Sequence, residues 1–129
     1  MSETIDLNEA AAALEHAQGV LDAGIARLAS DGIDDNQVLA YDVAHAAAGV
    51  MAARGLLSYG ARGQDEAKVT AAFAADVIGD LAAKLFGREH EWGVSPGALD
   101  GARDFVATYR GSEFLASLAD TDGPRHLSG

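Results

Sequence analysis

The residue types in this chain that suit metal or acid–base chemistry are four histidines and 20 acidic residues. A di-iron centre in a helical bundle uses a glutamate from each of two helices and a Glu-x-x-His pair from each of two others. The nearest spacing here is "DVAH", from Asp42 to His45, and neither His16 nor His90 has an acid three residues before it. We therefore expect no metal site, and we interpret His45 as a core histidine that donates one hydrogen bond.

The densest polar cluster is "REHEW", from Arg88 to Trp92. One interpretation is a helix end whose charges are solvated; the other is a ligand or partner contact in which Trp92 is an aromatic platform. Phosphate-binding glycine loops, Walker motifs and nucleophile elbows are absent from the sequence. The serines also lack a nearby His/Asp pattern, so nothing in their spacing indicates a hydrolase.

The 129 residues carry a formal net charge of −11. Such a surface repels phosphate backbones, so we expect no nucleic-acid partner. No apolar run approaches the ~20 residues that cross a bilayer, and the start of the chain lacks the basic segment of a secretory signal. The chain has no cysteine, which suits a reducing compartment. These features predict a soluble, cytoplasmic protein without membrane contact.

Apolar residues recur at helical spacing almost throughout, and no segment alternates as a half-buried strand does. Asp6 or Asn8 can cap a first helix over residues 6–30, with Gly32 as its stop. Further helices are expected up to Gly60, from Gln64 to about Gly87, and from Pro96 to about Tyr109, with Ser95 as the N-cap of the last. Short turns favour antiparallel neighbours. The predicted fold is all-α, an up-down four-helix bundle over residues 1–119, with a flexible tail or linker at 120–129.

The apolar stripe of each helix indicates which side faces the core. In the first helix the stripe comprises Leu7, Ala11, Leu14, Leu21, Ile25 and Leu28. In the third it comprises Val69, Phe73, Val77, Leu81 and Leu85. We expect these residues to form most of the contacts between helices.

The stretch "YDVAHAAAGVMAARGLLSYG", from Tyr41 to Gly60, predicts an unusually thin helix with two adjacent seams. The first seam comprises Tyr41, His45, Ala48, Ala52, Gly55 and Tyr59, and the second Leu39, Val43, Ala46, Val50, Ala53 and Leu57. Small residues let neighbouring helices approach to the short end of the usual separation of about 8–10 Å, so we expect neighbours on much of this helix. We assign to an interface with another chain the residues Tyr41, Ala48, Ala52, Gly55 and Tyr59.

From Val38 to Leu118 the order of several segments resembles the carboxy-terminal helical bundle of the acyl-CoA dehydrogenase family. The helix ending "AARGLLSYGARG", the helix "DEAKVTAAFAADVIGDLAAKLFG" and the stretch "GVSPGALDGARD" follow one another as similar pieces do in that family. "YRGSEFL" then stands where the family has Tyr-Glu-Gly-Thr. The resemblance implies a helical bundle that mediates dimer or tetramer contacts.

The chain differs from this family at the flavin contact and at the catalytic base. Where members carry a Gly-Gly-x-Gly-aromatic motif near the flavin's diphosphate–adenosine half, "FGREHEWGV" leaves Gly87, Arg88, Trp92 and Gly93 as candidates for cofactor contact. The glutamate that removes the α-proton of the acyl-CoA thioester in many members is replaced by Arg110. A guanidinium stays protonated and cannot be a general base. The resemblance therefore gives this chain no catalytic residue, and FAD only with a partner or a longer chain.

The family's amino-terminal helical domain and middle β-domain have no counterpart in these 129 residues. We therefore expect a non-catalytic helical domain that self-associates or docks to a flavin-dependent acyl-CoA dehydrogenase core, with a homo-oligomer or a flavoprotein chain as the partner. One alternative is a subunit or fragment of an active FAD-dependent dehydrogenase completed by a partner chain. Another is an unrelated bundle that binds a small molecule, although alanine-rich seams leave little room for a cavity.

Enlarging the small residues of the first seam tests the two-seam interpretation. We expect Ala48→Leu or Ala52→Leu to destabilise the bundle or its dimer by about 1–3 kcal/mol through overpacking. Melting temperature and oligomer size measure the effect. If both stay unchanged, these alanines are exposed and contact no neighbour.

Overall fold

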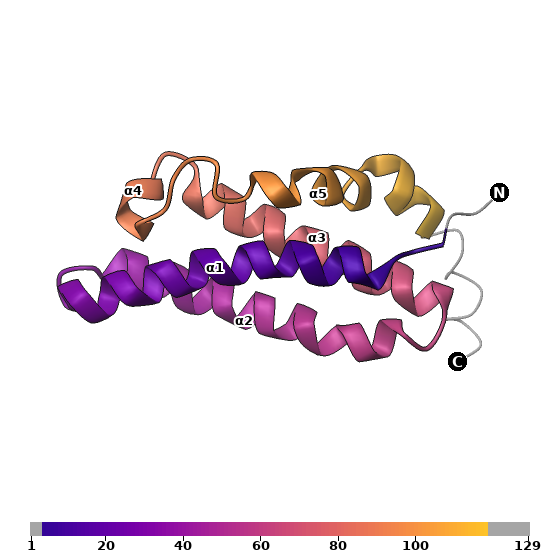
Figure 1. Cartoon of the computed structure of the whole chain (residues 1–129), viewed down its shortest axis with the longest axis horizontal. Coiled ribbons are helices and arrows are strands. Elements are labelled where there is room, and N and C mark those ends of the chain that lie inside the picture. The colour runs from indigo at the N-terminus through magenta and orange to yellow at the C-terminus, as the bar shows by residue number, and fades with distance from the viewer. Residues whose placement is uncertain (1–3, 119–129) are drawn as a thin grey trace.

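Three long helices carry most of the residues that this computed structural model describes, which are residues 4–118. They are α1 (Leu7–Asp31), α2 (Gln37–Gly60) and α3 (Gln64–Leu85). The helices run side by side along the long axis of the molecule and are joined by short turns (Figure 1). No strand occurs within residues 4–118, so the all-α prediction is confirmed for this part of the chain. The predicted tail, 120–129, lies outside the described residues.

Shorter helices complete the bundle on one side of α1 and α3. They are α4 (Glu89–Trp92), the 3-10 helix η1 (Asp100–Ala102) and α5 (Arg103–Tyr109), and residues 112–118 are helical as well. Figure 1 shows these segments lying along α1 and α3, away from α2. The fourth position of the predicted bundle is therefore filled by several short pieces instead of one continuous helix.

Local sequence signals set both ends of α1. The Asp6 carboxylate accepts a hydrogen bond from the Asn8 backbone N–H at 2.9 Å, which satisfies one of the donors that the first turn leaves free. At the other end Gly32 has a φ of 90° and donates its N–H to the Leu28 carbonyl. A residue with a side chain rarely adopts that conformation, so Gly32 stops the helix as expected.

One of the two seams predicted for α2 forms the core. Leu39, Val43, Ala46, Val50 and Ala53 are all buried, and Leu57 packs against them. The other seam, from Tyr41 to Tyr59, is exposed along its whole length. Within the described chain α2 is therefore packed on one side only, and its thin outer face has no neighbour there.

Alanines occupy most of the fully buried positions of α3. The predicted face is wrong in its first half: Phe73 is 37% exposed and Val69 and Val77 are only partly buried. The fully buried positions are instead Ala67, Thr70, Ala71, Ala74, Ala75, Ile78 and Leu81. Short side chains let the helix axes approach closely, and the larger side chains then flank the contact.

The same shift occurs in α1. Leu14 and Leu21 are buried as expected, but Ile25 is 51% exposed. The remaining buried positions are small or short: Ala10, Ala13, Ala17, Val20 and Gly24. The core between the long helices is therefore narrow.

The helix expected from Pro96 to Tyr109 is wrong in its first half, because α5 begins only at Arg103. From Ser95 to Ala102 the backbone makes i→i+3 bonds, as from the Ala98 N–H to the Ser95 carbonyl at 3.1 Å. Two glycines in this stretch, Gly97 and Gly101, each disfavour an α-helix by up to about 1 kcal/mol relative to alanine. Gly101 also packs directly on the His16 ring of α1, so the chain passes too close to α1 for a side chain at that position.

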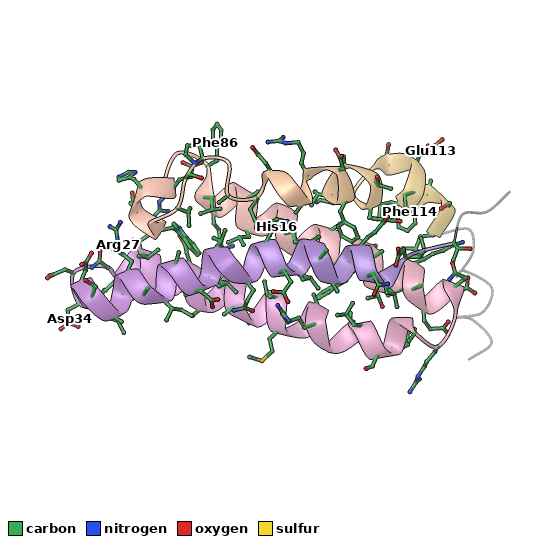
Figure 2. All side chains as sticks on the ribbon, viewed as in Figure 1. His16, Arg27, Asp34, Phe86, Glu113 and Phe114 are labelled. Carbon is green, nitrogen blue, oxygen red and sulfur yellow. The ribbon has the colours of Figure 1, made fainter. Side chains whose placement is uncertain are left out.

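Trp92 of α4 is the largest side chain in the main core cluster. It is completely buried, and its ring lies against Gly24 of α1, where an added Cβ would be 2.9 Å from a Trp92 ring carbon and 2.9 Å from Val43. Arg27 of α1 also donates a hydrogen bond to the His90 carbonyl at 3.0 Å. Gly24 therefore provides the space that lets α4 dock on α1, near Arg27 in Figure 2.

Two glycines of α1 test the importance of this contact. We expect Gly24→Ala to lower the free energy of unfolding by about 1–3 kcal/mol, because the new methyl group overlaps Trp92 and Val43. The matched change Gly19→Ala meets no atom within 4 Å and should raise it by about 0.5–1 kcal/mol through helix propensity. Urea titrations measure both, and equal effects of the two changes would contradict the Trp92 packing.

Candidate functional site

The residues assigned to an interface share one surface, the outward face of α2. Tyr41, Ala48, Ala52, Gly55 and Tyr59 are all exposed there, Tyr41 to 68%. His45 belongs to the same face, so its interpretation as a core histidine is wrong. Its ring stacks on Tyr41, with centroids 5.7 Å apart and planes 25° from parallel. We refer to these six residues as the α2 face.

The surroundings of the α2 face are apolar and poor in charge. Val38 and Met51, on its two flanks, are 60% and 74% exposed. The only acid in α2 is Asp42, whose side chain is 15% exposed and pairs with Arg88 at 3.2 Å. Arg54, the only base in α2, pairs with Glu15 of α1 at 3.2 Å. The α2 face thus carries no formal charge on a chain whose net charge is −11.

A groove borders the α2 face where α2 meets α3. It has a volume of about 300 Å³ and is lined by His45, Ala48, Val77, Asp80 and Lys84, among others. Its floor is shallow because Gly49 lies directly against Val77, which an added Cβ would approach to 3.3 Å. The groove extends the α2 face toward α3 and brings one acid and one base to its edge.

The candidates for cofactor contact have structural roles in this fold. Gly87 and Gly93 have φ of 82° and 76° and form the turns on either side of α4. Arg88 pairs with Asp42 at 3.2 Å and with Glu91 at 3.3 Å. Trp92 is completely buried, so it is not an exposed aromatic platform. Its indole N–H nevertheless finds no hydrogen-bond partner among the described residues.

Arg110, at the position that resembles the family's glutamate, links α5 to α3. Its guanidinium lies across Gly79, where an added Cβ would be 2.6 Å from Nη1. It also pairs with Asp76 of α3 at 3.6 Å. In this structure an arginine at position 110 therefore holds the end of α5 against α3.

Sequence reasoning missed a second surface feature, a hollow of about 350 Å³ between α3 and residues 96–107. It exists because the helix expected from Pro96 does not form. The pair Gly97 and Gly101 was the available signal, since two glycines four residues apart weaken any helix through that stretch. Phe86 projects from the bundle at the edge of this hollow (Figure 2).

Within residues 4–118 no group of three or more histidine, aspartate or glutamate side chains is arranged to hold a metal ion. In the same part of the chain no helix has the length and apolar character that crossing a bilayer requires.

Comparison of the chain with protein-family models, with curated proteins and with solved structures finds no match.

The single tryptophan of the chain makes its burial measurable. Because Trp92 is enclosed by α1 and α4, we expect acrylamide to quench its fluorescence several-fold less in the folded protein than in urea. The measurement is a pair of quenching titrations on the same sample. Equal quenching in the folded protein and in urea would mean that the indole is accessible, and it would favour the interpretation of Trp92 as a platform for a ligand.

Proposed function

We propose that this chain is a helical assembly module that pairs with a second copy of itself through the α2 face. The single observation that carries the proposal is the arrangement of that face. Its six residues follow one another at intervals of four, three, four, three and four, so they are symmetric about position 50. Equidistant from that point are Tyr41 and Tyr59, His45 and Gly55, and Ala48 and Ala52.

This symmetry is what an antiparallel contact between two copies of α2 requires. A twofold axis places the same patch on both partners, so that a residue i of one copy meets j of the other and the reverse. About an axis at position 50, Ala48 meets Ala52 of the second copy, and His45 meets Gly55. Among the four inner residues, His45 has the largest side chain, and it thus lies opposite Gly55, which has none.

The spacing and residue sizes also fit close packing of two helices. Alternating steps of three and four residues keep one stripe facing a partner in a left-handed supercoil with a crossing angle of about 20°. Alanines at the centre permit an axis separation near the lower end of about 8–10 Å. Tyr41 and Tyr59 then close the contact at both ends and bring most of its apolar area.

Charge favours a second copy at this surface over other surfaces of the same molecule. Two chains of net charge −11 repel each other, and an interface with acids opposite acids would add several kcal/mol of local repulsion. The α2 face has no acid; Asp42, the one acid of α2, is paired with Arg88, and Asp80 at the groove edge is accompanied by Lys84. Self-association is therefore least opposed along α2.

The resemblance to the acyl-CoA dehydrogenase bundle supports a finer proposal, in which the module docks to a flavin-dependent core of that family or belongs to an active FAD-dependent subunit completed by a partner chain. What favours it is the order of the resembling segments from Val38 to Leu118. Because Trp92 is buried and Arg88 is paired, any flavin contact by this loop falls to the backbone at Gly87 and Gly93. The visible absorption bands of flavin, recorded on the copurified complex, distinguish docking from self-association alone.

A charge placed at the centre of the α2 face tests the dimer. We expect Ala52→Arg to raise the dimer dissociation constant at least ~100-fold, because each copy would bury an unpaired guanidinium next to the symmetry axis. The unfolding free energy of the monomer should change by less than about 0.5 kcal/mol, since Ala52 is exposed in the single chain. Sedimentation equilibrium over a concentration series measures the association.

The control is Ala29→Arg, the same exchange at an exposed position near the end of α1. It adds the same charge and should leave the dissociation constant within about threefold of the original. If the unmodified chain is monomeric at all concentrations tested, or if both variants weaken the dimer equally, the α2 contact is wrong.

A further inference from the structure

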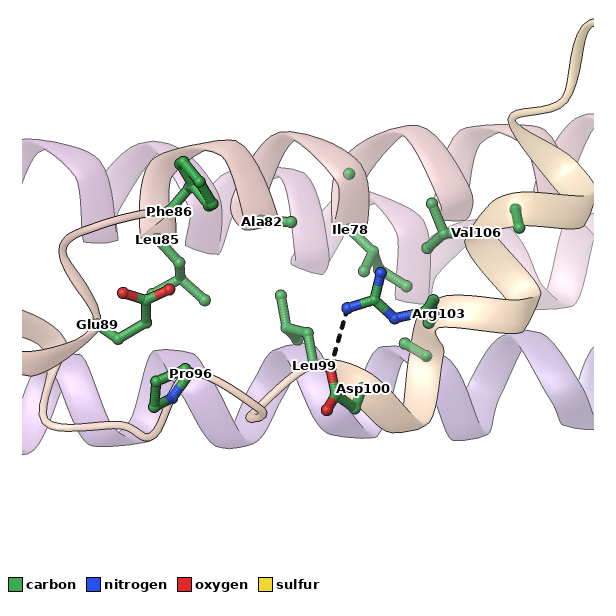
Figure 3. Close-up of a pocket in the computed structure, with 13 residues that line it drawn as sticks. Ile78, Ala82, Leu85, Phe86, Glu89, Pro96, Leu99, Asp100, Arg103 and Val106 are labelled. Atoms are coloured by element: carbon green, nitrogen blue, oxygen red, sulfur yellow. Dashed lines mark hydrogen bonds and ion pairs between the residues drawn. The ribbon is translucent and has the colours of Figure 1, made fainter.

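The hollow between α3 and residues 96–107 has the size of a ligand site. Its volume is about 350 Å³, within the ~300–1,000 Å³ typical of small-molecule pockets. It lies where the interrupted helix leaves the second half of α3 without a continuous partner (Figure 3). No residue of α2 lines it, so it is separate from the α2 face.

The floor of the hollow is aliphatic. Ile78 and Leu85 of α3 are almost fully buried, at 1% and 4% exposure. Leu99 and Val106 face them from the other wall, and Ala82 leaves the middle open (Figure 3). Such a surface favours an apolar group of several carbons over water.

Two oppositely charged groups occupy the end of the hollow near α5. The Arg103 guanidinium donates a hydrogen bond to the Asp100 carboxylate at 3.2 Å. Both side chains are largely exposed, with relative exposures of 76% and 64%. This pair is already neutral, so it offers an incoming ion no net charge.

The other end of the hollow presents a carboxylate without a counterion. Glu89, half-buried at the start of α4, makes no side-chain hydrogen bond or ion pair with any residue from 4 to 118. Phe86, which is 85% exposed, and Pro96 lie at the same end (Figure 3). A carboxylate beside an aromatic ring suits an ammonium group, which gains an ion pair and a cation–π contact worth ~0.5–1 kcal/mol at exposed sites.

We propose that this hollow binds an apolar monocation, with its ammonium group between Glu89 and Phe86 and its hydrocarbon part on Ile78, Leu85, Leu99 and Val106. An anion would meet Glu89 and the negative potential of a chain with net charge −11. A neutral apolar molecule would further desolvate the Glu89 carboxylate without pairing it, which costs binding free energy. Of the three, only an apolar cation both buries hydrocarbon on the aliphatic floor and pairs with the Glu89 carboxylate.

Three eight-carbon probes of different charge test the proposal. We expect n-octylammonium, titrated below its micelle concentration and followed by calorimetry, to bind saturably at one molecule per chain. 1-Octanol should bind at least ~10-fold more weakly, and octanoate should show no saturable binding. Backbone amide shifts in NMR spectra should concentrate at residues 78–86 and 96–106. Saturable binding of octanoate as tight as that of octylammonium would overturn the proposal, as would no saturation by octylammonium.

Single substitutions locate the ammonium group. Glu89→Gln should weaken octylammonium binding at least ~10-fold and tighten octanol binding, because octanol no longer desolvates a carboxylate. The matched change Glu113→Gln, at an exposed position outside the hollow, should change neither affinity. Ala82→Phe fills the hollow from an exposed position and should abolish binding of both probes. Equal octylammonium affinity in Glu89→Gln and the unmodified chain would contradict the role assigned to Glu89. This test does not depend on whether Ala82→Phe folds. Oligomer size, measured on the same samples, reports on the α2 face independently.

Discussion

The close approach of α1, α2 and α3 along their alanines is the constraint on which the rest of this structure depends. An alanine buries little apolar area, so each contact contributes little through the hydrophobic effect. The contacts gain instead from the many atoms that come within van der Waals distance when backbones approach closely. Leu14, Ile78 and Leu81 fill the spaces between the alanines, whereas Val69, Phe73 and Val77 lie at the edge of the core and are not fully buried. A three-helix core built in this way is narrow and depends on a few large residues elsewhere.

Trp92 is the clearest of these residues, and the local sequence around it follows from its position. Gly24 makes room for the indole in α1, while Gly87 and Gly93, with positive φ, turn the chain so that α4 can bring the ring inward. Arg88 then joins α4 to α2 through Asp42. The polar cluster that looked like a binding motif is thus the polar exterior of a packing element, with the aromatic residue as its buried part.

Much of the fold could be predicted from the sequence, because the long helices have uninterrupted periodicity and clear ends. Asp6, Gly32 and Gly60 lie at or next to helix ends, and the seam from Leu39 to Leu57 is the core seam of α2. The core side of α3 could not be predicted, since a hydrophobicity pattern favours Phe73 over alanine and ignores how closely helices approach. The break after Ser95 was missed because Pro96 is a good first residue of a helix. The role of Gly101 could not be read from the local sequence, since it comes from the close contact with His16 on another helix. Five residues of the α2 face were assigned to an interface from the sequence, and that assignment stays a prediction, whereas His45 was wrongly placed in the core. The hollow was not predicted, because it results from that break.

The α2 face and the hollow beside α3 differ in the charge that each can accept. The chain repels other acidic surfaces, including copies of itself, wherever its carboxylates are exposed. The α2 face carries no acid, the one acid of helix α2, Asp42, is paired with Arg88, and the residues of the face are symmetric about position 50. The hollow beside α3 has the opposite character, since its unpaired acid, Glu89, lies at the end of an aliphatic floor. The two proposals therefore assign a like-charged copy to α2 and a cation to the hollow, so that the same excess of negative charge would separate two kinds of partner on two sides of one small bundle.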